Sequence, residues 1–259
     1  MILASAMRLL DRILRSRIDP PHADYRVQLL LPRRARVDPI AIRNRLGGVE
    51  LVGANPTRFA LAMPFPGSIV HVYTAPVDAY AAELESSLRW SQTWRDRREV
   101  VARAQDSFVI ATALDPGPAH AAQLRTLHAV IDALLCSLDE RDAAACILHW
   151  MPAQQVMPCI RYRLLCKELG PSGPIVNVRI VEVEGTLLAD TIGFAPLGLP
   201  DLQARFRTRD PNEVALHLML LAKRVFAGEK LDRAAEERHL APPARDTLTI
   251  ALDPTPPAW

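Results

Sequence analysis

Residues 107–150 contain the pattern that most constrains the fold. The apolar run "SFVIATALDP" is stopped by Pro116, and the run "AAACILHW" ends at Trp150. Between them, from Ala119 to Leu138, apolar residues recur at the helical period. These residues are Leu124, Leu127, Ile131, Leu134, Leu135 and Leu138. A strand, a long helix and a strand in this order predict a βαβ unit with parallel strands and a right-handed crossover.

The chain before this unit predicts the order β-α-β-β-β. The apolar run "YRVQLLLP" is typical of a strand, and Asp38-Pro39 opens a short helix that ends at Gly47-Gly48, because Asp caps a helix and Pro suits its first position. "VELVG" and "RFALAMPF" form a predicted hairpin, and "SIVHVYT" adds a strand. From Pro76 to about Ala104 the spacing predicts two helices.

The chain after the βαβ unit has a weaker pattern between Pro152 and Pro174, where "VMPCIRYRLLCKEL" is expected to be partly helical. "PIVNVRIVEVEG" and "TLLADTIGF" alternate and predict a hairpin, followed by a helix from about Asn212 to Phe226. A last strand is expected at "TLTIAL" in a polar, Pro-rich tail.

These elements predict an α/β fold of the α+β type, with helices flanking a mixed sheet that contains one parallel βαβ unit. A chain of 259 residues fits a single compact domain. We divide it into an N-terminal amphipathic helix and linker (1–25), an α/β domain (26–230) and the C-terminal segment (231–259).

Composition excludes several functional classes. The content of 49% hydrophobic and 23% charged residues is ordinary for a folded globular protein, so neither disorder nor a fibrous class is indicated. The 31 basic and 29 acidic side chains nearly balance, which argues against a nucleic-acid partner. Only three basic residues are lysines, and this excess of Arg, together with Ala and Pro, indicates a GC-rich bacterial genome.

The four cysteines have no C-x-x-C spacing, and no secretory signal marks them as a disulfide framework. We therefore expect reduced thiols in a cytoplasmic protein. Cys136 and Cys146 lie in apolar helix and strand patterns, which favours burial over catalysis.

The first 18 residues form a predicted amphipathic helix. Arg8, Arg12 and Arg15 interrupt any signal-peptide core and share the face opposite the apolar residues. Docking on the body of the protein or on a partner is favoured, and attachment to a membrane surface is the weaker alternative. No stretch approaches the ~20 apolar residues of a membrane span.

The stretch "GFAPLGLPDLQARF" (193–206) has two glycines spaced as in a P-loop. Leu199-Pro200 stands where the phosphate-binding Lys and the hydroxyl residue would be required, so a P-loop phosphate clamp is excluded. We expect the stretch to enter a helix, with Pro200 in the first turn, Asp201 near the positive end, and Leu199, Leu202 and Phe206 pointing inward.

Catalytic and metal motifs are not apparent in the sequence. No pair of histidines has zinc-ligand spacing, no G-x-S-x-G turn is present, and no cofactor is implied. The best local candidates are His149 and Trp150 at a strand end, with Asp115 ending the parallel strand before it, because α/β sites gather at such ends. A structural role for His149 is nevertheless favoured.

Two further tryptophans, Trp90 and Trp94, are one helical turn apart. Packing in the core or between helices is the favoured interpretation of this spacing. With Trp150 they are the candidates for a pocket or an interaction surface.

The order of several short motifs resembles a bacterial family of unknown function, the domain-of-unknown-function family 4261. The motifs are "LLLP", "FALAMPFPGS", "LRWSQTW", "FVIATALDP", "ILHW", "TIGFAPLGLPDLQARF" and "LLAKRVFAGE", and they span about residues 26–230. Asp106-Ser107 and Asp232-Arg233 depart from the family pattern, where a His before the strand and Asp-Gly are usual. The resemblance implies a cytoplasmic bacterial protein, and some family members occur near type VI secretion or toxin-immunity loci.

These observations favour a non-enzymatic protein with a protein partner, such as an immunity or accessory protein of a type VI secretion or toxin system. The alternative is an enzyme or small-ligand binder with a site at Asp115, His149 and Trp150. A peripheral membrane protein anchored by the N-terminal helix is a third, less favoured hypothesis.

Overall fold

The strands of the protein form two antiparallel sheets. The computed structural model describes residues 25–63, 68–91, 94–113, 120–230 and 249–253. The N-terminal helix predicted for residues 1–18, and Asp115, lie outside this part of the chain. The larger sheet has the order β2-β3-β4-β5-β1-β6-β7 and the smaller has the order β11-β10-β9-β8.

The larger sheet contains the strands expected up to Trp150 and one strand that was not expected, β7, which overlaps the start of the segment predicted to be partly helical. They are β1 (Tyr25–Leu31), β2 (Glu50–Asn55), β3 (Arg58–Ala62), β4 (Ile69–Thr74), β5 (Asp106–Thr112), β6 (Ile147–Trp150) and β7 (Gln155–Pro158). β5 and β6 both pair antiparallel with β1, so the two strands of the predicted βαβ unit point the same way but have β1 inserted between them. The α+β class is confirmed, and its crossover is a split βαβ unit.

The smaller sheet contains a strand where the sequence predicts a helix. Its strands are β8 (Asn177–Val183), β9 (Thr186–Ile192), β10 (Asp201–Phe206) and β11 (Thr249–Asp253). The β8–β9 hairpin and the last strand were expected, but β10 lies where a helix was predicted. Leu202, Ala204 and Phe206 are buried at every second position, which is the strand period, so packing against the sheet decides the local structure.

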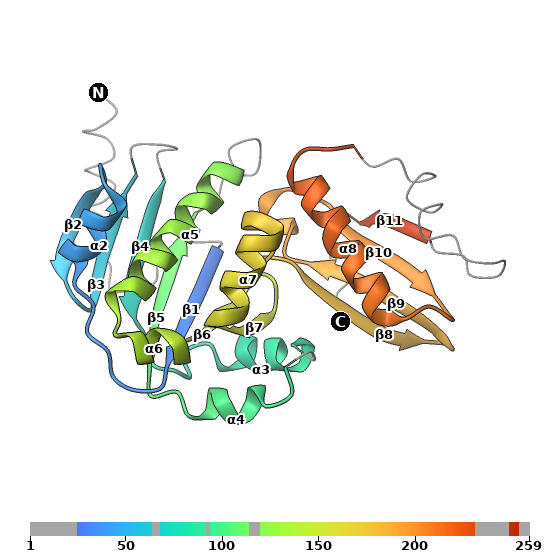
Figure 1. The fold of residues 1–259 in the computed structure, drawn as a ribbon, viewed down its shortest axis with the longest axis horizontal. Helices are drawn as coiled ribbons and strands as arrows, with labels where there is room; N and C mark the ends of the chain where they lie inside the picture. The colour runs from blue at the N-terminus through green and yellow to red at the C-terminus, as the bar shows by residue number, and fades with distance from the viewer. Residues whose placement is uncertain (1–24, 64–67, 92–93, 114–119, 231–248, 254–259) are drawn as a thin grey trace.

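Helices cover the sheets in two layers. One layer consists of α2 (Pro39–Leu46), α5 (His120–Ser137), α7 (Cys159–Leu169) and α8 (Pro211–Phe226), which lie on the near side of the sheets in Figure 1. The other contains α3 (Ala81–Trp90) and α4 (Arg97–Ala102), and the short helix α6 (Glu140–Ala145) precedes β6. The two helices expected between residues 76 and 104 are thus present as α3 and α4.

The pleat of β1 separates these two layers. Val27, Leu29 and Leu31 belong to the main core with α5 and α7, and this core continues under α8 to the smaller sheet. Leu30 points the other way and packs with Leu84 and other residues of α3 and α4. A single core therefore joins both sheets, while a second cluster fixes α3 and α4 on the opposite face.

The turn after β9 depends on Gly193. It has a φ of +129°, and a Cβ at this position would lie 1.8 Å from the carbonyl oxygen of Ile175. A short 3-10 helix, Ala195–Leu197, follows and ends at Gly198 in the left-handed conformation. The carboxylate of Asp201 accepts hydrogen bonds from Thr191 Oγ1 (3.1 Å) and Phe194 N (3.3 Å), so Asp201 holds this turn rather than a helix start.

Candidate functional site

His149 is fully buried between the larger sheet and α3. It lies opposite Gln28 in the β1–β6 register, and its side chain contacts Ser87 on α3. Nε2 of His149 is 2.9 Å from Ser87 Oγ, and Nδ1 is 3.3 Å from Gln28 Oε1. The structure therefore places His149 in a network of three polar side chains.

The neighbouring groups assign the hydrogens of this network. Ser107 Oγ donates to the carbonyl oxygen of Ala75 (2.7 Å), so it accepts from Gln28 Nε2 (3.1 Å). Oε1 of Gln28 then faces His149 and requires a proton on Nδ1, which leaves Nε2 to accept from the Ser87 hydroxyl. Ser87 Oγ also lies 2.8 Å from the carbonyl oxygen of Glu83, so its one hydrogen is shared between two acceptors.

The order hydroxyl, imidazole and amide has the form of a nucleophile, a base and an orienting group. Each of the three side chains has 0% exposure, so a substrate has no access to Ser87 Oγ. Burial lowers the pKa of His149 to about 4 and is opposed only by a hydrogen bond with Glu83. The network joins α3 to the sheet, and catalysis by His149 would require this packing to open.

Trp150 lies on the other face of β6, in the main core. Its ring contacts those of Tyr25 (6.1 Å between centroids), His128 (5.3 Å) and Tyr162 (6.3 Å), and it has no exposed surface. Because His149 and Trp150 are consecutive strand residues, they point into different layers and do not share a site.

The other two tryptophans are partly buried in packing contacts. Trp90 lies against the guanidinium of Arg179, 5.2 Å from the ring centroid, and Arg179 is paired with Asp190. Trp94 packs against the cluster formed by Leu30 and the residues of α3 and α4. The structure shows both tryptophans in packing contacts between elements, which is the favoured interpretation of their spacing.

His128 and Cys166 form a second polar contact, between α5 and α7. His128 Nε2 donates to the carbonyl oxygen of Pro171 (2.9 Å), and Nδ1 accepts from the Tyr162 hydroxyl (3.0 Å) with Cys166 Sγ at 3.8 Å. Burial lowers the pKa of His128 to about 4 and raises that of Cys166 to about 11. Both groups are neutral at pH 7, so this pair does not supply a reactive thiolate.

The cysteine predictions are partly corrected. Cys146 is buried as expected, whereas Cys136 is exposed, because it lies on the outer side of α5. Among the described residues, no group of three or more His, Cys, Asp or Glu side chains is arranged to hold a metal ion.

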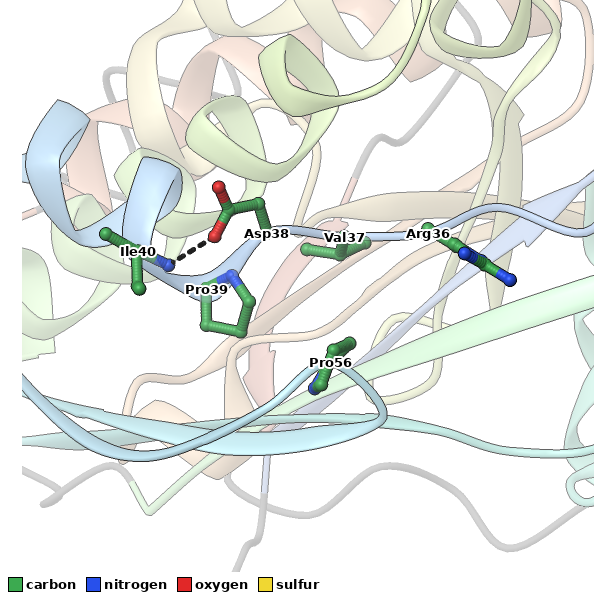
Figure 2. Close-up of a pocket in the computed structure, with 6 residues that line it drawn as sticks. All are labelled: Arg36, Val37, Asp38, Pro39, Ile40 and Pro56. Atoms are coloured by element: carbon green, nitrogen blue, oxygen red, sulfur yellow. Dashed lines mark hydrogen bonds between the residues drawn. The ribbon is translucent and has the colours of Figure 1, made fainter.

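A cavity of about 300 Å³ lies between the loop before α2 and the β2–β3 turn. Figure 2 shows its lining residues, Arg36, Val37, Asp38, Pro39, Ile40 and Pro56. The Asp38 carboxylate accepts the Ile40 N–H (2.9 Å) and caps α2. The remaining lining is apolar except for Arg36, so the cavity has neither a nucleophile nor a free base.

The outer sides of α7 and α8 carry four of the six exposed large hydrophobic side chains in the described part of the chain. Ile160 (63% exposed) and Leu164 (49%) are four residues apart on α7, and Leu216 (58%) and Leu220 (45%) are four apart on α8. This α7–α8 surface was not recognised in the sequence. The spacing of the apolar residues on α7 could have indicated it, because positions 160 and 164 lie on the helix side opposite the buried Tyr162.

No family model, curated protein or solved structure matches the chain. Within the described ranges, none of the helices combines the length and hydrophobicity that a membrane crossing requires.

Proposed function

We propose that this protein acts without catalysis, by binding another protein through the α7–α8 surface. The observation that supports this is the exposure of Ile160, Leu164, Leu216 and Leu220 on two neighbouring helices. Single exposed aliphatic residues are normal, but grouped ones mark interaction sites. Covering the exposed part of one leucine contributes about 1 kcal/mol, so four such residues can contribute substantially to binding.

The proposal also concerns the cellular system in which this interaction takes place. The resemblance to domain-of-unknown-function family 4261 supports a cytoplasmic bacterial protein, and within it an immunity or accessory protein of a type VI secretion or toxin system. The partner is then a protein of the same system. The enzyme alternative at His149 and Asp115 has less support, because His149 is sealed from solvent and Trp150 faces another layer.

Co-purification after crosslinking in cells tests the binding proposal. The double variant Leu164→Ser/Leu220→Ser removes two side chains that are 49% and 45% exposed, so the fold should be retained. The matched control is Ile40→Ser/Val183→Ser, which removes two side chains that are 48% and 40% exposed elsewhere.

We expect a crosslinked partner with the wild-type protein and the control, and at least about a tenfold lower yield with the Leu164/Leu220 variant. Equal recovery with all three proteins, or an equal loss with the control, would overturn the proposal. A toxin or secretion component as the recovered partner would support the narrower role, and a metabolic enzyme would contradict it.

A further inference from the structure

The two helices of the α7–α8 surface repeat one pattern. Ile160, Leu164 and Lys167 on α7 have the same spacing as Leu216, Leu220 and Lys223 on α8. In each set the second residue follows the first by four positions and the Lys follows by seven, so all three lie along one side of the helix. Each helix therefore presents two aliphatic side chains and a cation next to them.

The helices are joined in one continuous layer. Lys223 Nζ donates to the carbonyl oxygen of Glu168 at the end of α7 (3.3 Å). His120 at the start of α5 contacts Phe226 at the end of α8, with 5.2 Å between the ring centroids. Figure 1 shows α5, α7 and α8 side by side on one side of the molecule.

This helix layer is basic, although the whole chain has a net charge of only +2. Helices α2, α5, α7 and α8 contain eight cations and three anions, a net charge of +5. The cations are Arg43, Arg45, Arg125, Arg161, Arg163, Lys167, Lys223 and Arg224, and the anions are Asp132, Glu168 and Glu213. Helices α3 and α4 on the other face contain three of each sign, so the excess charge belongs to one face.

Two cations beside the aliphatic residues are available to a partner. Arg163 and Lys167 are exposed on α7, and within the described chain neither forms an ion pair. Complementary charge at the rim of an apolar contact accelerates association and selects the partner. A second copy of this chain would place like charges together.

Resting on the proposed function, we propose that the partner presents an acidic amphipathic helix to the α7–α8 surface. Its aliphatic residues at i and i+4 would pack across Leu164 and Leu220, and its carboxylates would face Arg163 and Lys167. A membrane is a poorer fit, because a helix that lies in a bilayer inserts a broad apolar face, whereas α7 and α8 bury theirs in the core and expose two large aliphatic side chains each. Nucleic acid is also a poorer fit, because the outermost side chains between the cations are apolar.

Binding of two synthetic helical peptides to the full-length protein tests the proposal. Both peptides carry leucine at the same i, i+4 positions, one with glutamate and the other with lysine at the flanking positions. We expect the glutamate peptide to bind at least about tenfold more tightly, and its affinity to fall with added salt. Leu164→Ser/Leu220→Ser should abolish this binding.

Charge reversal provides the matched control. Arg163→Glu/Lys167→Glu should remove or invert the preference for the glutamate peptide. Arg89→Glu/Arg95→Glu makes the same change in charge around α3 and should leave the preference intact. The inference would be overturned if neither peptide bound or if the two peptides bound equally well. It would also be overturned if the two charge variants changed the preference in the same way.

Two further arms test the other classes of partner. Tighter binding to phosphatidylglycerol vesicles or to a DNA duplex than to the glutamate peptide would contradict the inference. In cells, a crosslinked partner that requires Leu164 and Leu220 but not Arg163 and Lys167 would contradict the acidic helix and leave the proposed function standing. A partner that requires neither pair would contradict both.

Discussion

Ser87 Oγ lies 2.9 Å from Nε2 of His149 in a contact that solvent does not reach. A serine next to an imidazole is the usual arrangement of an activated nucleophile. Here burial lowers the pKa of His149 to about 4, whereas a general base works best with a pKa near the operating pH. The pair links α3 to β6 across 62 residues of sequence, so its effect should appear in stability.

Replacing Ser87 by Ala should lower the free energy of unfolding by about 1–3 kcal/mol, because Nε2 of His149 then loses its partner in a buried site. Urea unfolding at pH 7 measures this change. Ser86→Ala is the control, since Ser86 Oγ has only a long contact with Gln154 Oε1 (3.4 Å), and it should cost less than about 0.5 kcal/mol. Equal costs for the two variants would contradict the structural role of Ser87.

Much of the fold was predictable because its signals are local. The spacing of apolar residues in α5 and α8, the alternation in β8 and β9, and the Asp-Pro start of α2 each act within a few residues. The segment that forms β10 has no such decisive local signal. Leu199, Leu202 and Phe206 fit the helical period, whereas Leu202, Ala204 and Phe206 fit the strand period, and six residues are too few to decide.

The contacts of the candidate site were not predictable, because they join distant parts of the chain. His149 was singled out by its strand end, but its partners Ser87 and Gln28 are 62 and 121 residues away and carry no motif. The inserted β1 also changes the neighbours of β5 and β6, and no rule of spacing predicts such an insertion.

Gly193 should tolerate no side chain. A Cβ would lie 1.8 Å from the Ile175 carbonyl oxygen, so the backbone must move, and we expect Gly193→Ala to cost at least about 3 kcal/mol. Gly185→Ala is the matched control, because its φ of +71° is also left-handed but a Cβ there meets no atom within 4 Å. That control should cost only about 1–2 kcal/mol in thermal or urea unfolding. Similar losses would show that backbone conformation, not the close approach, makes Gly193 necessary.

Asp201 should make stability depend on pH. Burial raises its pKa from 3.8 to about 6, against hydrogen bonds from Phe194 and Thr191, so the folded state favours the protonated form. The stability that the protonated carboxyl group provides is fully present below pH 3.8, and it is lost as the pH rises through 6. Asp201→Asn cannot ionise, so its stability relative to wild type should increase by about 2 kcal/mol between pH 4 and pH 7. Urea unfolding of both proteins at each pH measures this, and a pH-independent difference would contradict it.

The ion pair between Arg179 and Asp190 should be the most sensitive polar contact of the smaller sheet. Arg179 Nε donates to Asp190 Oδ1 (3.0 Å), and the two side chains are only 4% and 8% exposed. Asp190→Ala leaves the guanidinium buried without its counterion, so it should cost about 3–5 kcal/mol. Glu85→Ala, which breaks the exposed pair with Arg98, is the control and should cost less than about 1 kcal/mol.

The double variant Arg179→Met/Asp190→Leu separates the cost of the orphaned charge from the value of the pair. Removing both charges leaves no unpaired ion, so much of the stability lost in Asp190→Ala should return. Urea unfolding of the wild type, the single variant and the double variant under one condition provides the comparison. A double variant as unstable as Asp190→Ala would show that the pair itself, with the contact of Arg179 on Trp90, stabilises the sheet.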